Sequence, residues 1–161
     1  MATIAELLAS SLNALKQVQR GEDFTIIKSS DLSRTHIKRL VDNHFLKPII
    51  KGWYVVTDPR ATPGDSTAWY ASFWSFISRY ANERYGNEWC LSAEQSLSIY
   101  TGATIIPNQV LIRAPKGNDH MVPLIPPTSV FNLGAELPSK IDTNNPYNLN
   151  LYTLAEAIIV A

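Results

Sequence analysis

The chain has 161 residues, enough for one or two domains with a buried core, and its 45% hydrophobic and 17% charged residues exclude a disordered polyelectrolyte. The formal net charge is zero, and the single cysteine, Cys90, excludes an internal disulfide framework. The N-terminus lacks the pattern of a signal peptide, and no stretch reaches the roughly 18 apolar residues of a membrane helix. We therefore expect a cytoplasmic protein that makes no membrane contact.

Charge is distributed unevenly along the chain. Residues 1–60 hold nine Lys and Arg against six Asp and Glu, whereas residues 61–161 hold five against eight. A basic first part is consistent with a nucleic-acid partner for that part.

The first 60 residues predict a helix, a short strand, a second helix and a hairpin. Apolar residues at helical spacing predict a helix over 4–18 that ends by Gly21, and 24–27 favours a strand. Ser33 is suited to cap a helix from Arg34 to about Asn43, which Pro48 would keep from continuing. The runs 49–50 and 53–56 then read as two strands around a tight Lys51-Gly52 turn.

The remainder of the chain predicts a mixed arrangement of helices and strands. Residues 61–65 are turn-rich and form the best domain boundary, and Asp65 or Ser66 can cap a helix over 67–83 whose aromatic residues are expected mainly in the core. Ser92 and Gln95 predict a capping box that opens a helix ending near Tyr100. Further strands are expected at 89–91, 110–114, 122–124 and 129–133, followed by an element that begins at 149–152 and a helix over 154–160.

These elements predict an α+β protein: a winged helix-turn-helix domain over 1–60 and a small mixed α/β domain over 61–161. The chain ends in the apolar sequence AIIVA, with no helix cap and no polar tail. We expect further chain to pack against this end, so that the second domain is truncated at its C-terminus.

The second helix has the pattern of a helix that reads DNA. Its apolar residues fall on one side, which leaves the other side polar and basic, as docking in a major groove requires. In the expected interface, Arg34, Thr35 and Lys38 approach base edges, whereas Lys28, Arg39 and the hairpin residue Lys51 contact phosphate. A basic helix face is also often only solvated, and winged helices also serve as protein-interaction modules.

Two stretches carry a family resemblance. Residues 26–56, with DLS at 31–33 and GWY at 52–54, resemble the N-terminal winged helix of the AbiEi family of antitoxins. The sequences LSAEQSL at 91–97, TGAT at 101–104 and IPNQV at 106–110 resemble the family's next segment, so that the likeness covers roughly 24–135.

The resemblance implies a bacterial transcriptional regulator and antitoxin. In that family the winged helix binds repeats in its own promoter, and the following domain counteracts a nucleotidyltransferase-type toxin. Related proteins carry the same pair of domains before a Fic domain, and LYTLAEA at 151–157 is similar to that junction. The expected partners are therefore double-stranded DNA, a toxin and, for a repeated operator, a second copy of the chain. The alternative is a non-catalytic interaction module of a Fic-type or nucleotidyltransferase-type toxin.

No pattern in the sequence predicts an enzyme. His36, His44 and His120, with a single cysteine, lack the spacing of a metal site. Ser92 lacks the glycines of a nucleophile elbow, and the isolated glycines form no phosphate-binding loop. We expect no catalytic residue, no metal and no cofactor.

Overall fold

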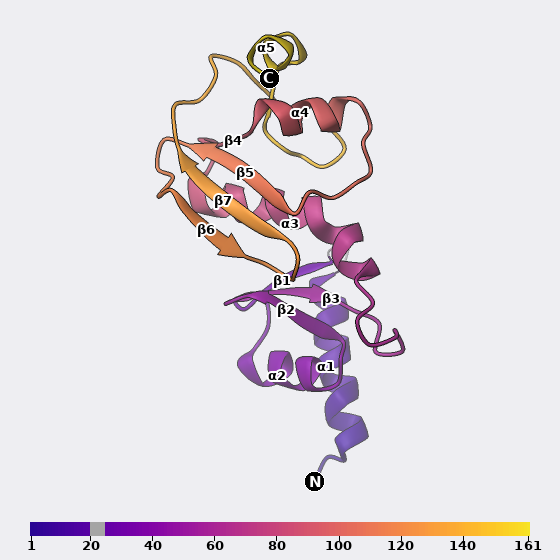
Figure 1. Ribbon diagram of the computed structural model, residues 1–161. Coiled ribbons are helices and arrows are strands. Elements are labelled where there is room, and N and C mark those ends of the chain that lie inside the picture. The colour runs from indigo at the N-terminus through magenta and orange to yellow at the C-terminus, as the bar shows by residue number, and fades with distance from the viewer. Residues whose placement is uncertain (20–24) are drawn as a thin grey trace. The chain divides into compact units, whose positions relative to one another are not determined.

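The computed structural model describes residues 1–19 and 25–161 of the chain (Figure 1). They form two compact units, Met1–Ser72 and Phe73–Ala161, named unit 1 and unit 2 below. Each unit combines helices with its own sheet, which confirms the α+β class. The turn-rich residues 61–65 lie in unit 1, just before the helix that continues into unit 2. The expected helix end at Gly21 and the strand start at Phe24 lie outside the described residues.

Unit 1 is built from two helices and a three-stranded antiparallel sheet. Its elements are α1 (Ile4–Val18), β1 (Ile26–Lys28), α2 (Arg34–Asp42), β2 (Leu46–Ile50) and β3 (Trp53–Val56), and the strand order is β1-β3-β2. The core contains Leu15 of α1, Ile27 of β1, Leu40 of α2 and Leu46 of β2, each at most 4% exposed. One apolar cluster therefore joins both helices to the sheet.

The end of α2 corrects the role predicted for Pro48. His44 has a left-handed φ of 64°, and the Phe45 N–H donates to the carbonyl of Leu40 at 2.9 Å. Together with the bond from the His44 N–H to the Val41 carbonyl, this is a Schellman motif, so the helix ends there. Pro48 lies inside β2 instead, which is tolerated because β2 is an edge strand of the sheet.

Unit 2 contains a mixed four-stranded sheet covered by helices. The helix α3 (Thr67–Tyr85) leads into it, followed by β4 (Cys90–Leu91), α4 (Ala93–Tyr100), β5 (Gln109–Ala114), β6 (His120–Pro123) and β7 (Ser129–Gly134). The strand order is β4-β5-β7-β6, with β5 parallel to β7 and the other pairs antiparallel.

The second part of α3 packs on one face of this sheet. Tyr85 donates its hydroxyl to Oδ1 of the buried Asn132 of β7 at 2.7 Å, and the Asn132 amide donates to the Tyr80 hydroxyl at 3.2 Å. These bonds satisfy a polar side chain that is fully buried between helix and sheet. Of the aromatic residues expected in the core, Tyr70 is the exception, at 36% exposed.

The capping box predicted at Ser92 forms only in half. The Gln95 N–H donates to Ser92 Oγ at 3.2 Å, as expected. The Gln95 side chain, however, accepts from the Leu111 N–H at 3.0 Å and donates to the Gln109 carbonyl at 2.9 Å. It therefore connects α4 to β5 instead of returning to its own helix start.

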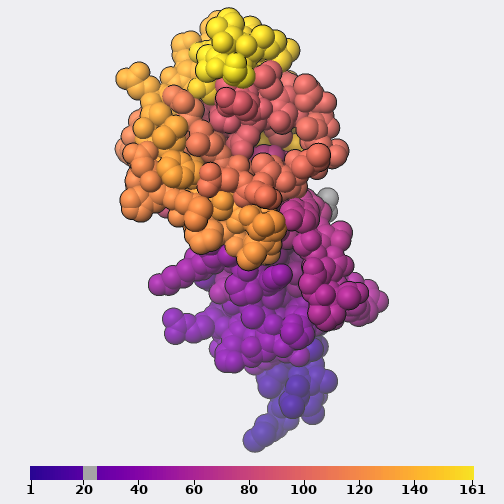
Figure 2. All heavy atoms as spheres, in the orientation of Figure 1, coloured from indigo at the N-terminus to yellow at the C-terminus, as the bar shows by residue number. Residues whose placement is uncertain are grey.

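The chain ends in a small two-stranded sheet, β8 (Ile141–Asp142) and β9 (Leu151–Tyr152), and in α5 (Leu154–Val160). The two-residue strand β8 was not predicted, since it carries no periodic signal. α5 packs beside α4 and lies at the surface of unit 2 (Figures 1 and 2). Ile158, Ile159 and Val160 are more than half exposed, and the expectation that further chain packs there stays a prediction.

Candidate nucleic-acid interface

The helix α2 presents a polar face because its sequence is amphipathic and firmly capped. Ser33 has extended backbone angles, and its hydroxyl accepts from the His36 N–H at 3.2 Å. Ile37 and Leu40 are buried, whereas Arg34 and Lys38 are exposed, as the 3.6-residue period requires. This confirms the prediction that the apolar side of α2 faces the core and its basic side faces solvent.

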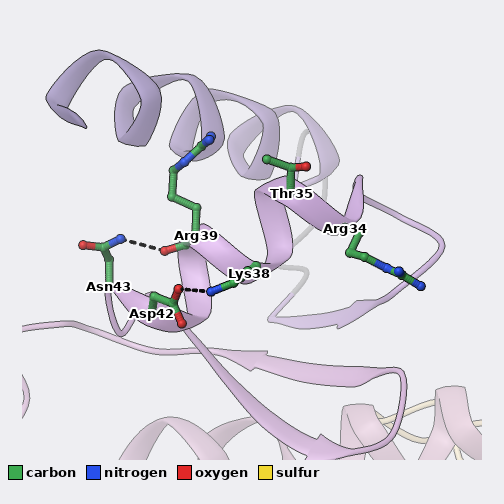
Figure 3. Close-up of a pocket in the computed structure, with 6 residues that line it drawn as sticks. All are labelled: Arg34, Thr35, Lys38, Arg39, Asp42 and Asn43. Carbon is green, nitrogen blue, oxygen red and sulfur yellow. Dashed lines mark hydrogen bonds and ion pairs between the residues drawn. The ribbon is translucent and has the colours of Figure 1, made fainter. Parts of the chain in front are cut away.

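A shallow depression of about 320 Å³ follows the exposed face of α2 (Figure 3). We name it the α2 depression. Arg34 lies at one end and extends away from α1, without a hydrogen bond or ion pair to any other described residue. The α2 depression is lined by Arg34, Thr35, Lys38, Arg39, Asp42 and Asn43.

A second depression, of about 420 Å³, lies between α2 and the turn of the β2–β3 hairpin. We name it the hairpin depression. Arg34 lines this one too, together with Lys51, which is exposed and likewise has no partner among the described residues. Two unpaired cations that lie 17 positions apart in the sequence therefore border one concave surface. The hairpin depression is lined by Ser29, Arg34, Ile37, Lys51, Gly52 and Tyr54.

Gly52 holds the hairpin turn in place beside this depression. Its φ of +85° lies in the left-handed region, where a side chain is strained. The Gly52 carbonyl accepts from the Ser29 N–H at 2.9 Å, and a Cβ at Gly52 would meet Ser29 Oγ at 3.3 Å. The turn that carries Lys51 is thereby fastened to the segment that precedes α2.

Arg39 is oriented differently from the phosphate contact expected of it. Its Nη1 donates to Ser11 Oγ at 2.8 Å and to the Leu7 carbonyl at 3.2 Å, both on α1, and Figure 3 shows the side chain directed toward that helix. Ser11 is fully buried and also lies 2.8 Å from Nδ1 of His36. Because a guanidinium only donates, Ser11 Oγ accepts from Arg39, and its own proton is available to His36. Arg39 and His36 thus fasten α2 to α1.

Lys28 is also engaged within unit 1. Its Nζ lies 5.1 Å from the centroid of the Trp53 ring, a cation–π contact across the β1–β3 pair. Its backbone N–H donates to Asp31 Oδ2 at 2.8 Å, which supports the turn before α2. Of the six predicted interface residues, Arg34, Thr35, Lys38, Arg39 and Lys51 line the two depressions, and Lys28 lines neither. Arg39 differs from the other four because its Nη1 is bonded to α1.

Sequence reasoning left Asp42 and Asn43 without a role in the interface, although both line the α2 depression. The Lys38 Nζ lies 2.8 Å from Asp42 Oδ2, and their side chains are 76% and 57% exposed. The four-residue spacing of opposite charges was the signal that could have revealed this pair. The Asn43 amide donates to the Arg39 carbonyl at 2.7 Å and closes the end of the helix.

Other reactive groups occupy structural positions. Burial raises the pKa of the Cys90 thiol to about 12. The pKa of Tyr100 is raised far above its ordinary range. Burial is the larger cause, and a hydrogen bond to Asp142 is the second. Within residues 1–19 and 25–161, no group of three His, Cys, Asp or Glu is placed to hold a metal ion. No helix in that part of the chain is long and apolar enough to cross a membrane.

Comparison of the chain with protein-family models, with curated proteins and with solved structures finds no match.

Proposed function

We propose that the chain is a sequence-specific DNA-binding transcriptional regulator whose unit 1 acts as a winged helix-turn-helix. In this proposal α2 enters the major groove and the β2–β3 hairpin forms the wing. The order helix, strand, helix, hairpin and the strand order β1-β3-β2 support it. The main support is the hairpin depression, which the unpaired cations Arg34 and Lys51 both line.

The contacts divide between base edges and phosphates. Arg34, at the first turn of α2, has the planar set of donors that pairs with the O6 and N7 atoms of guanine. Thr35, beside it in the α2 depression, offers a hydroxyl to the same groove. Lys51 at the hairpin turn is placed for a phosphate. Arg39 and Lys28 contribute indirectly, since they hold α2 and the hairpin in position.

Fluorescence anisotropy tests the proposal directly. The full chain is titrated onto labelled duplex from upstream of its own gene and onto a scrambled duplex, across a salt series. We expect tight binding to the upstream duplex only, with a log–log salt slope of about −2 to −5, as two to five phosphate contacts require. Absence of binding to either duplex at low salt would refute the proposal.

The antitoxin role remains a second proposal, which rests on the resemblance to AbiEi proteins. A chain with both Arg34→Ala and Lys51→Ala separates the two activities, because both residues lie in unit 1 and are exposed. We expect this variant to lose DNA binding and still to suppress a co-expressed Fic-type or nucleotidyltransferase-type toxin. If suppression is lost together with DNA binding, the activities are not separate.

A further inference from the structure

Asp42 is an unexpected residue on the surface that we propose to face DNA. It is the single carboxylate among the six residues that line the α2 depression, where the others include three cations. Its Oδ2 lies 2.8 Å from the Lys38 Nζ, and both side chains are more than half exposed. A carboxylate at this position repels the phosphate backbone that the neighbouring cations would attract.

Helix stability does not explain why Asp42 is there. It is the last residue of α2, where the helix dipole disfavours a negative charge. The pair also has the less favourable direction, because a base followed four residues later by an acid stabilises a helix less than the reverse. Where a residue conflicts with two local rules on an exposed helix, function is the expected reason.

The Lys38–Asp42 pair divides the α2 depression into two parts. At one end Arg34 is unpaired and continues into the hairpin depression. At the other end Lys38 is neutralised by Asp42, and Arg39 directs its Nη1 into α1. The cation of this depression that has no partner among the described residues is therefore at the Arg34 end.

We infer that Asp42 is a specificity-determining residue, and this inference rests on the function proposed above. On DNA of arbitrary sequence, Asp42 keeps Lys38 from phosphate. At the correct site, the carboxylate accepts a hydrogen bond from the exocyclic N4 amino group of a cytosine in the major groove, which leaves Lys38 free to bind the DNA. Guanine and thymine offer no amino group there and leave the carboxylate desolvated and unpaired, and adenine places its N7 acceptor beside its amino group, so these three bases are disfavoured.

The test compares Asp42→Asn with Asp58→Asn. Asp58 is an exposed carboxylate of unit 1 that pairs with Arg60 at 3.2 Å and lines neither of the two depressions. Both variants remove one negative charge from an exposed ion pair, so a general charge effect would be equal in the two. Circular dichroism confirms that each variant is folded, and anisotropy measures binding to a mixed-sequence duplex and to the upstream duplex across a salt series.

For Asp42→Asn we expect one additional phosphate contact, made by the released Lys38. The salt slope on mixed-sequence DNA steepens by about 0.9, which corresponds to roughly eightfold tighter binding at 0.1 M salt. Selection from a randomised duplex library is expected to enrich one cytosine with the wild-type chain and to shift that preference toward adenine with Asp42→Asn, because an amide both donates and accepts. Asp58→Asn keeps the wild-type slope and preference.

Two outcomes would overturn the inference, and they differ. If Asp42→Asn and Asp58→Asn give the same slopes and the same selected sequences while the wild-type chain binds its upstream DNA, Asp42 has no role in specificity and the DNA-binding proposal stands. If the wild-type chain binds no duplex at low salt, the proposed function is wrong and the role of Asp42 is wrong with it.

Discussion

Two arginines on one helix are expected to respond to truncation in opposite ways. Arg39 donates two hydrogen bonds to α1, to Ser11 Oγ and the Leu7 carbonyl, whereas Arg34 has no partner among the described residues. Hydrogen bonds made by a charged group contribute about 1.5–3 kcal/mol each. Because Arg39 is partly exposed and its bond to Leu7 is long at 3.2 Å, we expect Arg39→Ala to lower the free energy of unfolding by about 2 kcal/mol in total.

Arg34→Ala is the matched control for that substitution. An exposed side chain without a partner changes stability by no more than about 0.5 kcal/mol. Its removal is expected to weaken binding to the upstream duplex by about 1–3 kcal/mol and to relax the preference for one base, because Arg34 is proposed to contact a guanine and not a phosphate. Arg39→Ala is expected to keep the wild-type slope at a temperature where the variant is fully folded.

Urea unfolding followed by circular dichroism measures the first effect, and anisotropy across a salt series measures the second. An Arg39→Ala variant with unchanged stability and a salt slope reduced by about 0.9 would refute the assignment of Arg39 to α1. That result would mean that Arg39 leaves α1 to contact phosphate.

Three further substitutions or treatments test the structure at single positions. Gly52→Ala should lower the free energy of unfolding by about 1–2 kcal/mol, because a side chain is strained at a φ of +85°. It should also weaken DNA binding, because the hairpin turn is displaced. Urea and anisotropy curves identical to those of the wild-type chain would contradict this. His44→Gly should raise stability by roughly 0.5–1 kcal/mol in urea unfolding, since His44 has a φ of 64° at the end of α2, and an unchanged or lower midpoint would show that the strain is offset. Cys90 should react with iodoacetamide at pH 8 only after denaturation, because burial raises its pKa to about 12 and the thiolate is the reactive form; rapid labelling of the folded chain, followed by mass spectrometry, would contradict its burial.

Local sequence patterns are sufficient to predict the elements whose causes lie in neighbouring residues. The helix α2 begins after Ser33 because a serine side chain can satisfy the free N–H groups of the first turn, and its polar face follows from the 3.6-residue period. The turn at Lys51 and Gly52 was predicted because glycine readily adopts a positive φ. The exposure of Arg34 and Lys51 followed from the same local patterns.

Contacts between residues that are distant in the sequence depend on the packing of the whole fold. Arg34 and Lys51 border one depression because the strand order β1-β3-β2 places the hairpin turn beside the start of α2. Arg39 fits a phosphate contact by type and spacing, but the packing of α1 on α2 brings Ser11 within 2.8 Å of its guanidinium. Gln95 likewise leaves the expected capping box because β5 offers backbone partners at hydrogen-bonding distance. Periodicity and capping are properties of neighbouring residues, whereas the partner of a long polar side chain depends on segments that only folding brings together.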